Sequence, residues 1–288
     1  MIKIVIRSFN VFKILQNIPF VRKFIVFDIR SFDSINSVYD FAFAVSTFST
    51  ESKHGKTTNA NRFLDLDSVV IKFLSLQGAI KIHDVAVSSG VTSCELLNRV
   101  KGLNKRYQFI ISDKYVNYFV SGNAIVRIYN ADKKLLYGYI FRVLADENVS
   151  KYFPLSKILY FLLKAIPYPN KFNRVQLFDV ETKKMLKTNE LNYVEYDLFG
   201  TNLLDNNSFV RCMNVLNGNS WFSEKQIIMG VSNLKSSLIE GGILLIGRTD
   251  DVLNQNNASF FKKTNDKLVH LEDFNFGSDI KTIIKNNF

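Results

Sequence analysis

The residues best suited to bind a ligand form a short turn, Ser88-Ser89-Gly90, between an apolar run and a helical pattern. The run from Ile80 to Val87 predicts a buried strand, and Thr92 or Ser93 is expected to cap a helix with Glu95 in its first turn. Strand, tight turn and helix together present backbone N–H groups and a helix N-terminus to a ligand. An ordinary turn without a ligand is the alternative, because only one glycine of a dinucleotide fingerprint is present.

A carboxylate follows the next predicted strand, at the spacing that a bound nucleoside would require. The segment from Tyr107 to Ser112 predicts a second buried strand, and Asp113 comes directly after it. In α/β nucleotide-binding folds an acid at this place, roughly 20 residues after the turn, hydrogen-bonds ribose hydroxyls. Two features at the spacing of one ligand favour a nucleoside site, with a surface acid after a strand as the alternative.

Histidine and cysteine residues indicate little further chemistry. His54, His83 and His270 are scattered without metal-ligand spacing, so no metal site is predicted. His83 lies inside the first predicted strand and is interpreted as a packed core residue, whereas His54, in a polar loop, is a candidate base. Cys94 and Cys212 lie far apart without CxxC spacing, which excludes a disulfide framework and suits a reducing cytoplasm.

Length and composition indicate a folded α/β protein. The chain has 288 residues, 47% of them hydrophobic, which suits one large domain or one domain with an insert. No uncharged run approaches the ~20 residues that span a bilayer. The apolar, basic N-terminus is expected to form amphipathic helices packed on the domain, with weak contact to a membrane surface as the alternative.

The formal net charge of +11 favours acidic partners such as nucleic acid, anionic lipid or acidic protein surfaces. The lysines and arginines are spread along the chain and form no block, and no RNA-binding or helix-turn-helix signature accompanies them. Nucleic acid is therefore the weaker interpretation of the charge, and a coding bias toward Lys, Asn, Ile and Phe is the stronger one.

A different pattern runs from Asn117 to about Lys187. Residues 124–141 predict two strands joined by a turn at 130–133, and Leu155 to Ile166 predicts an apolar helix that Pro167 terminates. This block reads as an insert between the second and third strands, at the edge of the sheet where a substrate enters. A specificity subdomain, a dimer face and a lipid-facing lid are the alternatives for it.

The α/β pattern then resumes. Asn192 to Tyr196 predicts a third strand that ends at Asp197, and residues 208–217 predict a fourth with Asn214 near its end.

The C-terminal third is expected to complete the sheet. Glu224 to Leu238 predicts a helix, and Gly241 and Gly242 are expected to supply its C-cap. A buried strand that ends near Asp250 is expected to follow. The last segments, KLVHLEDFN and DIKTII, are expected to form an antiparallel edge pair.

Taken in order, these pieces resemble a class I S-adenosylmethionine-dependent methyltransferase over roughly Thr57 to Asp250. They most resemble the chemotaxis-receptor (protein-glutamate) methyltransferases. The residues that carry the likeness are Thr58 with Arg62, the turn Ala86/Ser89/Gly90, Asp113, NYVEY, Asn214-Val215 and IEGGILLIGRTD. Val91 and Thr92 stand where that family has paired glutamates, and Met213 replaces its arginine, with Arg211 two residues earlier on the same face of the strand.

The resemblance implies a Rossmann-like methyltransferase fold of the α/β class. Its central, mostly parallel sheet is flanked by helices and carries a small β-hairpin/helix insert. Residues 1–56 would be an N-terminal helical extension, and residues 57–288 the methyltransferase domain with the insert at about 117–187.

The resemblance also implies S-adenosyl-L-methionine as the cofactor. Asp113 would accept hydrogen bonds from its ribose, and the guanidinium of Arg62 would meet its carboxylate. Asp197 and Leu198 would bracket the adenine, with Asn202 as a rival for the amine contact. The implied cofactor-binding set is Thr58, Arg62, Asp84, Ala86, Ser88, Ser89, Gly90, Glu95, Asp113, Lys114, Asp197, Leu198, Asn214 and Val215. The candidates for catalysis are Asn214, Arg211 and His54.

The sequence therefore predicts a cytoplasmic enzyme that transfers a methyl group to an unidentified acceptor, either a protein carboxylate or a small molecule. An RNA or DNA methyltransferase is one alternative, although NVLN stands where amino-methylating enzymes place an Asn/Asp-Pro-Pro-Tyr/Phe motif. A catalytically inactive methyltransferase fold that serves as a binding module is the other. The sequence leaves the acceptor and the oligomeric state open.

Overall fold

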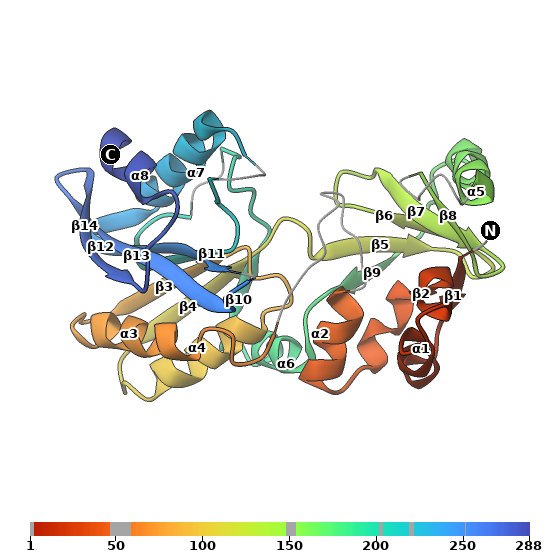
Figure 1. Ribbon diagram of the computed structural model, residues 1–288, viewed down its shortest axis with the longest axis horizontal. Coiled ribbons are helices and arrows are strands. Elements are labelled where there is room, and N and C mark those ends of the chain that lie inside the picture. Colours follow the sequence, from red (N-terminus) through yellow and green to blue (C-terminus); the bar gives the residue numbers. More distant parts are fainter. Residues whose placement is uncertain (1–2, 47–58, 148–153, 202–203, 219–221, 251) are drawn as a thin grey trace. The chain divides into compact units, whose positions relative to one another are not determined.

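The chain forms two compact units in the computed structural model, which describes residues 3–46, 59–147, 154–201, 204–218, 222–250 and 252–288 (Figure 1). The first unit combines Met1–Ala60 with Tyr115–Val180, and the second combines Asn61–Lys114 with Glu181–Phe288. Each unit contains a seven-stranded sheet. In the described residues, no helix has the length and apolar character needed to cross a bilayer.

The sheet of the second unit has the strand order β10-β4-β3-β11-β12-β13-β14. Its first five strands are parallel neighbours, β13 pairs antiparallel with β12, and β14 pairs antiparallel with β13. The chain runs outward from β3 to β10, then returns to β11 on the other side of β3, so the strand order reverses between β3 and β11. In open α/β sheets a ligand binds at such a switch point, at the carboxyl ends of the strands. The strands are β3 (Ile80–Val85), β4 (Tyr107–Ser112), β10 (Asn192–Val194), β11 (Asn207–Met213), β12 (Leu238–Asp250), β13 (Gln255–Thr264) and β14 (Lys267–Phe274).

Helices cover both faces of this sheet (Figure 1). On one side lie α3 (Leu64–Ser75) and α4 (Val91–Lys101), and on the other α7 (Glu224–Ser236) and α8 (Lys281–Asn287). A further helix, α6 (Val180–Lys187), precedes β10. Because β11 lies at the centre, all of its residues are buried, which is the pattern of a strand packed on both faces.

The first unit has the strand order β2-β1-β8-β7-β6-β5-β9, antiparallel except between β1 and β2. One face packs against α1 (Phe9–Gln16) and α2 (Val38–Ser46), and the other against α5 (Pro154–Ala165). The strands are β1 (Ile4–Ile6), β2 (Ile25–Phe27), β5 (Asn117–Ser121), β6 (Ile125–Tyr129), β7 (Leu135–Ile140), β8 (Val143–Asp146) and β9 (Asn173–Gln176). The described part of this unit also contains the 3-10 helices η1 (Val21–Phe24) and η2 (Ile29–Ser34). The N-terminal segment thus contributes the strands β1 and β2 in addition to its helices. These two strands share one sheet with the strands of the predicted insert, β5 to β9, and the sequence did not predict this pairing.

Several predicted elements are confirmed: the strands at β3, β4, β10 and β11, the hairpin of β6 and β7, and the helices α4, α5 and α7. The predicted cap of α4 is wrong. Its N-cap is Gly90, whose φ of 86° turns the chain into the helix, and Thr92 and Ser93 lie within the first turn. Glu95 therefore lies beyond that turn rather than in it.

Two further predictions near the C-terminus are wrong. Helix α7 ends before a C-cap at Ser237, and Gly241 and Gly242 lie within β12, where pairing with β11 shifts register. A Cβ on Gly242 would lie 2.9 Å from the Ile239 carbonyl oxygen, so this irregular strand start needs a small residue. The segment expected to form the second edge strand is helix α8 instead, and β14 pairs with β13, which was not predicted.

Candidate functional site at the switch point

The turn after β3 has an unusual backbone. Ala86, Ser88 and Gly90 have φ values of 58°, 57° and 86°, in the left-handed region. This conformation is uncommon for residues with a side chain, and such strain is concentrated at functional sites. A Cβ on Gly90 would lie only 2.4 Å from Oγ1 of Thr182 on α6, so only glycine fits there.

Asp113 and this turn lie together, as the sequence predicted. The backbone N–H of Ser88 donates to Oδ2 of Asp113 at 2.8 Å, and Asp113 is buried. The backbone N–H of Val87 also donates to the Ser112 carbonyl oxygen at 3.1 Å, which fastens the turn to the end of β4. Two segments 25 residues apart in the chain thus form one site at the carboxyl edge of the sheet.

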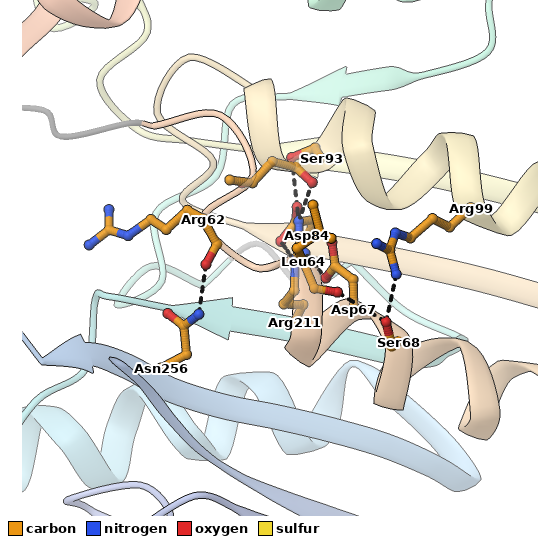
Figure 2. Close-up of polar contacts among 10 residues, drawn as sticks. Arg62, Leu64, Asp67, Ser68, Asp84, Ser93, Arg99, Arg211 and Asn256 are labelled. Atoms are coloured by element: carbon orange, nitrogen blue, oxygen red, sulfur yellow. Dashed lines mark hydrogen bonds and ion pairs between the residues drawn. The ribbon is translucent and has the colours of Figure 1, made fainter. Parts of the chain in front are cut away.

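A buried ionic network lies beneath the turn (Figure 2). Arg211 of β11 donates to both carboxylate oxygens of Asp84 of β3, from Nε at 2.9 Å and from Nη2 at 2.5 Å. Its Nη1 donates to Asp67 of α3 at 2.8 Å, and its Nη2 also reaches the Thr92 carbonyl oxygen at 3.1 Å. Ser93 of α4 donates to Asp84 at 2.6 Å. The network therefore fixes two strands and two helices around the turn.

Burial shapes the charges of this network. Burial alone would lower the pKa of Arg211, but the charges of Asp84 and Asp67 and their hydrogen bonds raise it above its usual value, so the guanidinium stays charged. Burial raises the pKa of Asp67 to about 6, against the attraction of Arg211, and the charge of Asp84 adds to the rise. Asp67 Oδ2 has no hydrogen-bond partner among the described residues. One cation thus faces two carboxylates, and Asp67 is the one held close to protonation.

The structure places the three candidates for catalysis very differently. Arg211 is 1% exposed and fully engaged, so its geometry is that of a residue that positions the turn. Asn214 lies just after β11 with a φ of 62°, and its Oδ1 accepts a hydrogen bond from the Thr249 backbone N–H at 2.7 Å. His54 lies outside the described residues, as do Thr58 and Asn202.

Thr249, near the end of β12, connects Asn214 to Arg62. Its Oγ1 accepts from Nε of Arg62 at 2.9 Å and donates to Oδ1 of Asn256 at 2.8 Å. Asn256 in turn donates to the Arg62 carbonyl oxygen at 2.7 Å, a contact visible in Figure 2. The sequence analysis did not select Thr249 or Asn256; the one available signal was the polar RTD at the end of a buried apolar strand.

The loops after β4 and β10 also meet. Lys114 donates to Oδ2 of Asp197 at 2.6 Å, and Oδ1 of Asp197 accepts from the Phe199 backbone N–H at 3.0 Å. Leu198 is buried and Val215 half-buried, and both belong to the apolar cluster beneath this edge. Glu95 accepts from the Asn61 backbone N–H at 2.6 Å.

His83 is the core residue that the sequence predicted. It is fully buried in β3, where its Nε2 lies 2.8 Å from Oγ of Ser112 and its ring packs edge-on against Tyr196. Burial lowers the pKa of His83 to about 4, so the imidazole is neutral near pH 7.

Two serine hydroxyls at the turn leave hydrogen-bonding capacity for a ligand. The Oγ atoms of Ser88 and Ser89 are buried and have no hydrogen-bond partner in the described part of the chain. A buried polar group without a partner costs roughly 1–3 kcal/mol, so a site that leaves two of them at one turn suits a polar ligand. Together with the turn's backbone N–H groups, these hydroxyls could hydrogen-bond a polar ligand at the carboxyl edge of the sheet.

No protein-family model matches the chain, and no curated protein matches it. Solved structures share a distant likeness. The PH0226 protein from Pyrococcus horikoshii is 11% identical, with 78% of this chain and 77% of that one covered and a TM-score of 0.35. The DszA carbon methyltransferase is 12% identical, with coverage of 68% and 38% and a TM-score of 0.36.

An O-methyltransferase family protein from Burkholderia thailandensis is also 12% identical, with coverage of 77% and 42% and a TM-score of 0.32. The chain spans only 38% of the length of the DszA methyltransferase and 34% of the citrinin polyketide synthase CMeT domain. Likenesses at this level carry no argument about what this chain does.

Proposed function

We propose that the chain is an S-adenosylmethionine-dependent methyltransferase whose cofactor binds at the switch point between β3 and β11. The observation that supports this most strongly is the hydrogen bond from the Ser88 backbone N–H to Asp113. It places a strained, glycine-ended turn beside a carboxylate at the end of the neighbouring strand, which is the pairing that a nucleoside with a polar tail requires.

The residues present fit the proposed cofactor. Asp113 would accept hydrogen bonds from the ribose, and the unpartnered hydroxyls of Ser88 and Ser89 would hold the methionine part. Arg62, which Thr249 orients through a 2.9 Å hydrogen bond, would supply positive charge for the carboxylate. Asp197 would accept from the adenine amine, beside Leu198.

Methyl transfer from S-adenosylmethionine requires mainly that the protein position the acceptor. When bound, S-adenosylmethionine supplies an activated methyl group. The protein's part is to hold the acceptor in line and to exclude water, at the rim formed by Asn214 and Val215. A carboxylate acceptor needs no general base. We therefore propose a protein carboxylate or a small molecule as the acceptor class.

The likeness to the chemotaxis-receptor methyltransferases is proposed for the cofactor site alone. Asp113, the turn and Asn214 lie at one edge of the sheet, which supports that part of it. The arginine nearest to that family's substrate-side position, Arg211, is buried under the turn, so it lends no support to a receptor glutamate as the substrate.

Calorimetric titration with S-adenosylhomocysteine tests the proposal. Wild-type protein is expected to bind in the micromolar range, about −8 kcal/mol, and Asp113→Ala to lose binding. Asp113→Asn keeps an acceptor for the Ser88 N–H but loses the charge, so it separates support of the turn from contact with the ribose. Asp132→Ala, an exposed acid in the β6–β7 turn, is the matched control.

Two results would contradict the proposal. If folded wild-type protein does not bind S-adenosylhomocysteine, S-adenosylmethionine is not its cofactor. Unchanged binding by Asp113→Ala would move the ribose contact elsewhere.

A further inference from the structure

Helix α5 of the first unit carries an exposed apolar face. Ile158, Phe161 and Leu162 are 57%, 56% and 55% exposed, although such side chains are usually buried. Leu155, and Ile166 directly after the helix, are exposed to 39% each. At 100° per residue, Ile158 points most directly away from the buried side of the helix, Leu155 and Leu162 lie on one flank of it, and Phe161 lies on the other. We call these five side chains the α5 face.

The opposite side of the helix fixes this face in place. Tyr160 donates from its hydroxyl to the Leu135 carbonyl oxygen at 3.0 Å, and Ser156 accepts from the Asp146 backbone N–H at 3.1 Å. Leu163 is fully buried. Beyond the C-terminus, Arg127 donates to the carbonyl oxygens of residues 166 and 167 at 3.1 and 2.7 Å. The α5 face is therefore held outward by contacts with the sheet.

Positive charge lies on the other flank of the helix. Lys157 and Lys164, seven residues apart, are both exposed on the side away from Leu155 and Leu162. Residues 154–178 contain four Lys or Arg and no Asp or Glu. The unit as a whole has 17 Lys or Arg and 8 Asp or Glu, a net charge of +9, so the second unit accounts for only +2 of the total of +11.

We propose that the α5 face docks the protein onto an anionic lipid bilayer. An exposed apolar stripe beside lysines is the pattern of a helix that lies in the interfacial plane, with its apolar side chains among the acyl chains and its lysines at the headgroups. Phosphate-rich nucleic acid would complement the charge equally well, but it would leave Leu155, Ile158 and Leu162 in water. The combination of aliphatic side chains with lysines favours a lipid surface. This proposal is independent of the cofactor site.

Flotation of the full chain with vesicles tests the proposal. Vesicles of phosphatidylcholine with about 30% phosphatidylserine are expected to bind wild-type protein, and vesicles of phosphatidylcholine alone to bind it at least tenfold more weakly. The double variant Ile158→Gln/Phe161→Gln should weaken binding to the anionic vesicles at least tenfold. Lys157→Gln/Lys164→Gln should weaken it on the order of thirtyfold, since each lysine near an anionic surface contributes about 1 kcal/mol.

Matched controls distinguish binding through the α5 face from nonspecific adsorption to vesicles and from misfolding of the variants. Leu76→Gln, at an 86% exposed leucine of the second unit, and Lys225→Gln, on α7, should bind as wild type does. Unchanged thermal unfolding of the α5 variants shows that they fold.

Three outcomes would overturn the proposal. They are no vesicle binding by wild-type protein, equal binding by the Ile158→Gln/Phe161→Gln variant, or loss of binding to a single-stranded RNA in the α5 variants without loss of vesicle binding.

Discussion

The buried network makes a quantitative prediction about Asp67. Burial raises the pKa of this carboxyl from 3.8 to about 6 in the folded chain. Each pKa unit corresponds to about 1.4 kcal/mol, so a shift of this size corresponds to about 3 kcal/mol of folding free energy. The folded state holds the proton more tightly than the unfolded chain does. The stabilisation is therefore fully present below pH ~4 and is lost as the pH rises through ~6.

The substitution Asp67→Asn isolates this effect. The amide keeps an oxygen that accepts from Arg211 Nη1, which lies 2.8 Å from Asp67 Oδ1, but it does not titrate. The free energy of unfolding of the variant, relative to wild type, should therefore rise by about 2 kcal/mol between pH 4 and pH 7.5. Comparing the two proteins at each pH cancels the contributions of all other carboxyls.

Urea unfolding followed by circular dichroism at pH 4, 5, 6, 7 and 7.5 measures the difference. Asp65→Asn, at an exposed acid two residues earlier on α3, is the control and should change stability little at neutral pH. A difference between Asp67→Asn and wild type that stays constant across this range would refute the reasoning. It would mean that Arg211 compensates Asp67 fully and that the network carries two ionised carboxylates.

Three further substitutions test the site, and Gly241→Ala is the control for the first of them. Gly90→Ala should destabilise the fold by about 1–3 kcal/mol and abolish S-adenosylhomocysteine binding, because the new Cβ would lie 2.4 Å from Thr182 Oγ1. In thermal unfolding Gly241→Ala, with φ of 80° but no atom nearer than 3.9 Å, should cost only about 1 kcal/mol. Arg211→Met should cost about 3–5 kcal/mol in urea unfolding, because it leaves two buried carboxylates without their cation; a loss below 1 kcal/mol would contradict the network. Thr249→Val should weaken S-adenosylhomocysteine binding about tenfold in calorimetry without a large change in melting temperature, since it removes the hydrogen bond that orients Arg62; wild-type affinity would show that Arg62 does not need this contact.

The sequence by itself determined the local elements around the site. The apolar run before Ser88 and the one before Asp113 could only be buried strands, and the small residues between strand and helix required a tight turn. These features depend on neighbours within a few residues, which hydrophobic pattern and turn chemistry report directly. The sequence also placed Asp113 and the turn at the spacing that one ligand would require, and the Ser88–Asp113 hydrogen bond shows that they lie side by side.

Only the tertiary structure decided which polar side chains were already engaged. Arg211 looked available on the sequence, yet Asp67 and Asp84, 144 and 127 residues away, bury it completely. Arg211 is buried because both faces of β11 are covered. The residue pattern along β11 does not indicate which acidic side chains contact Arg211. Thr249 is the reverse case, since only the approach of Asn214, Asn256 and Arg62 gives it a role.

The pairing of the N-terminal segment with the insert was also decided by tertiary structure. Ile4–Ile6 is a three-residue strand whose partners lie at Ile25–Phe27 and, through a single pair, at Val143. So short a strand has no periodicity of its own, and long-range pairing sets its register. The sequence also does not predict which apolar side chains of α5 are exposed. The sequence gives an apolar helix, but burial of Tyr160 and Leu163 against the sheet decides which of its apolar residues face outward.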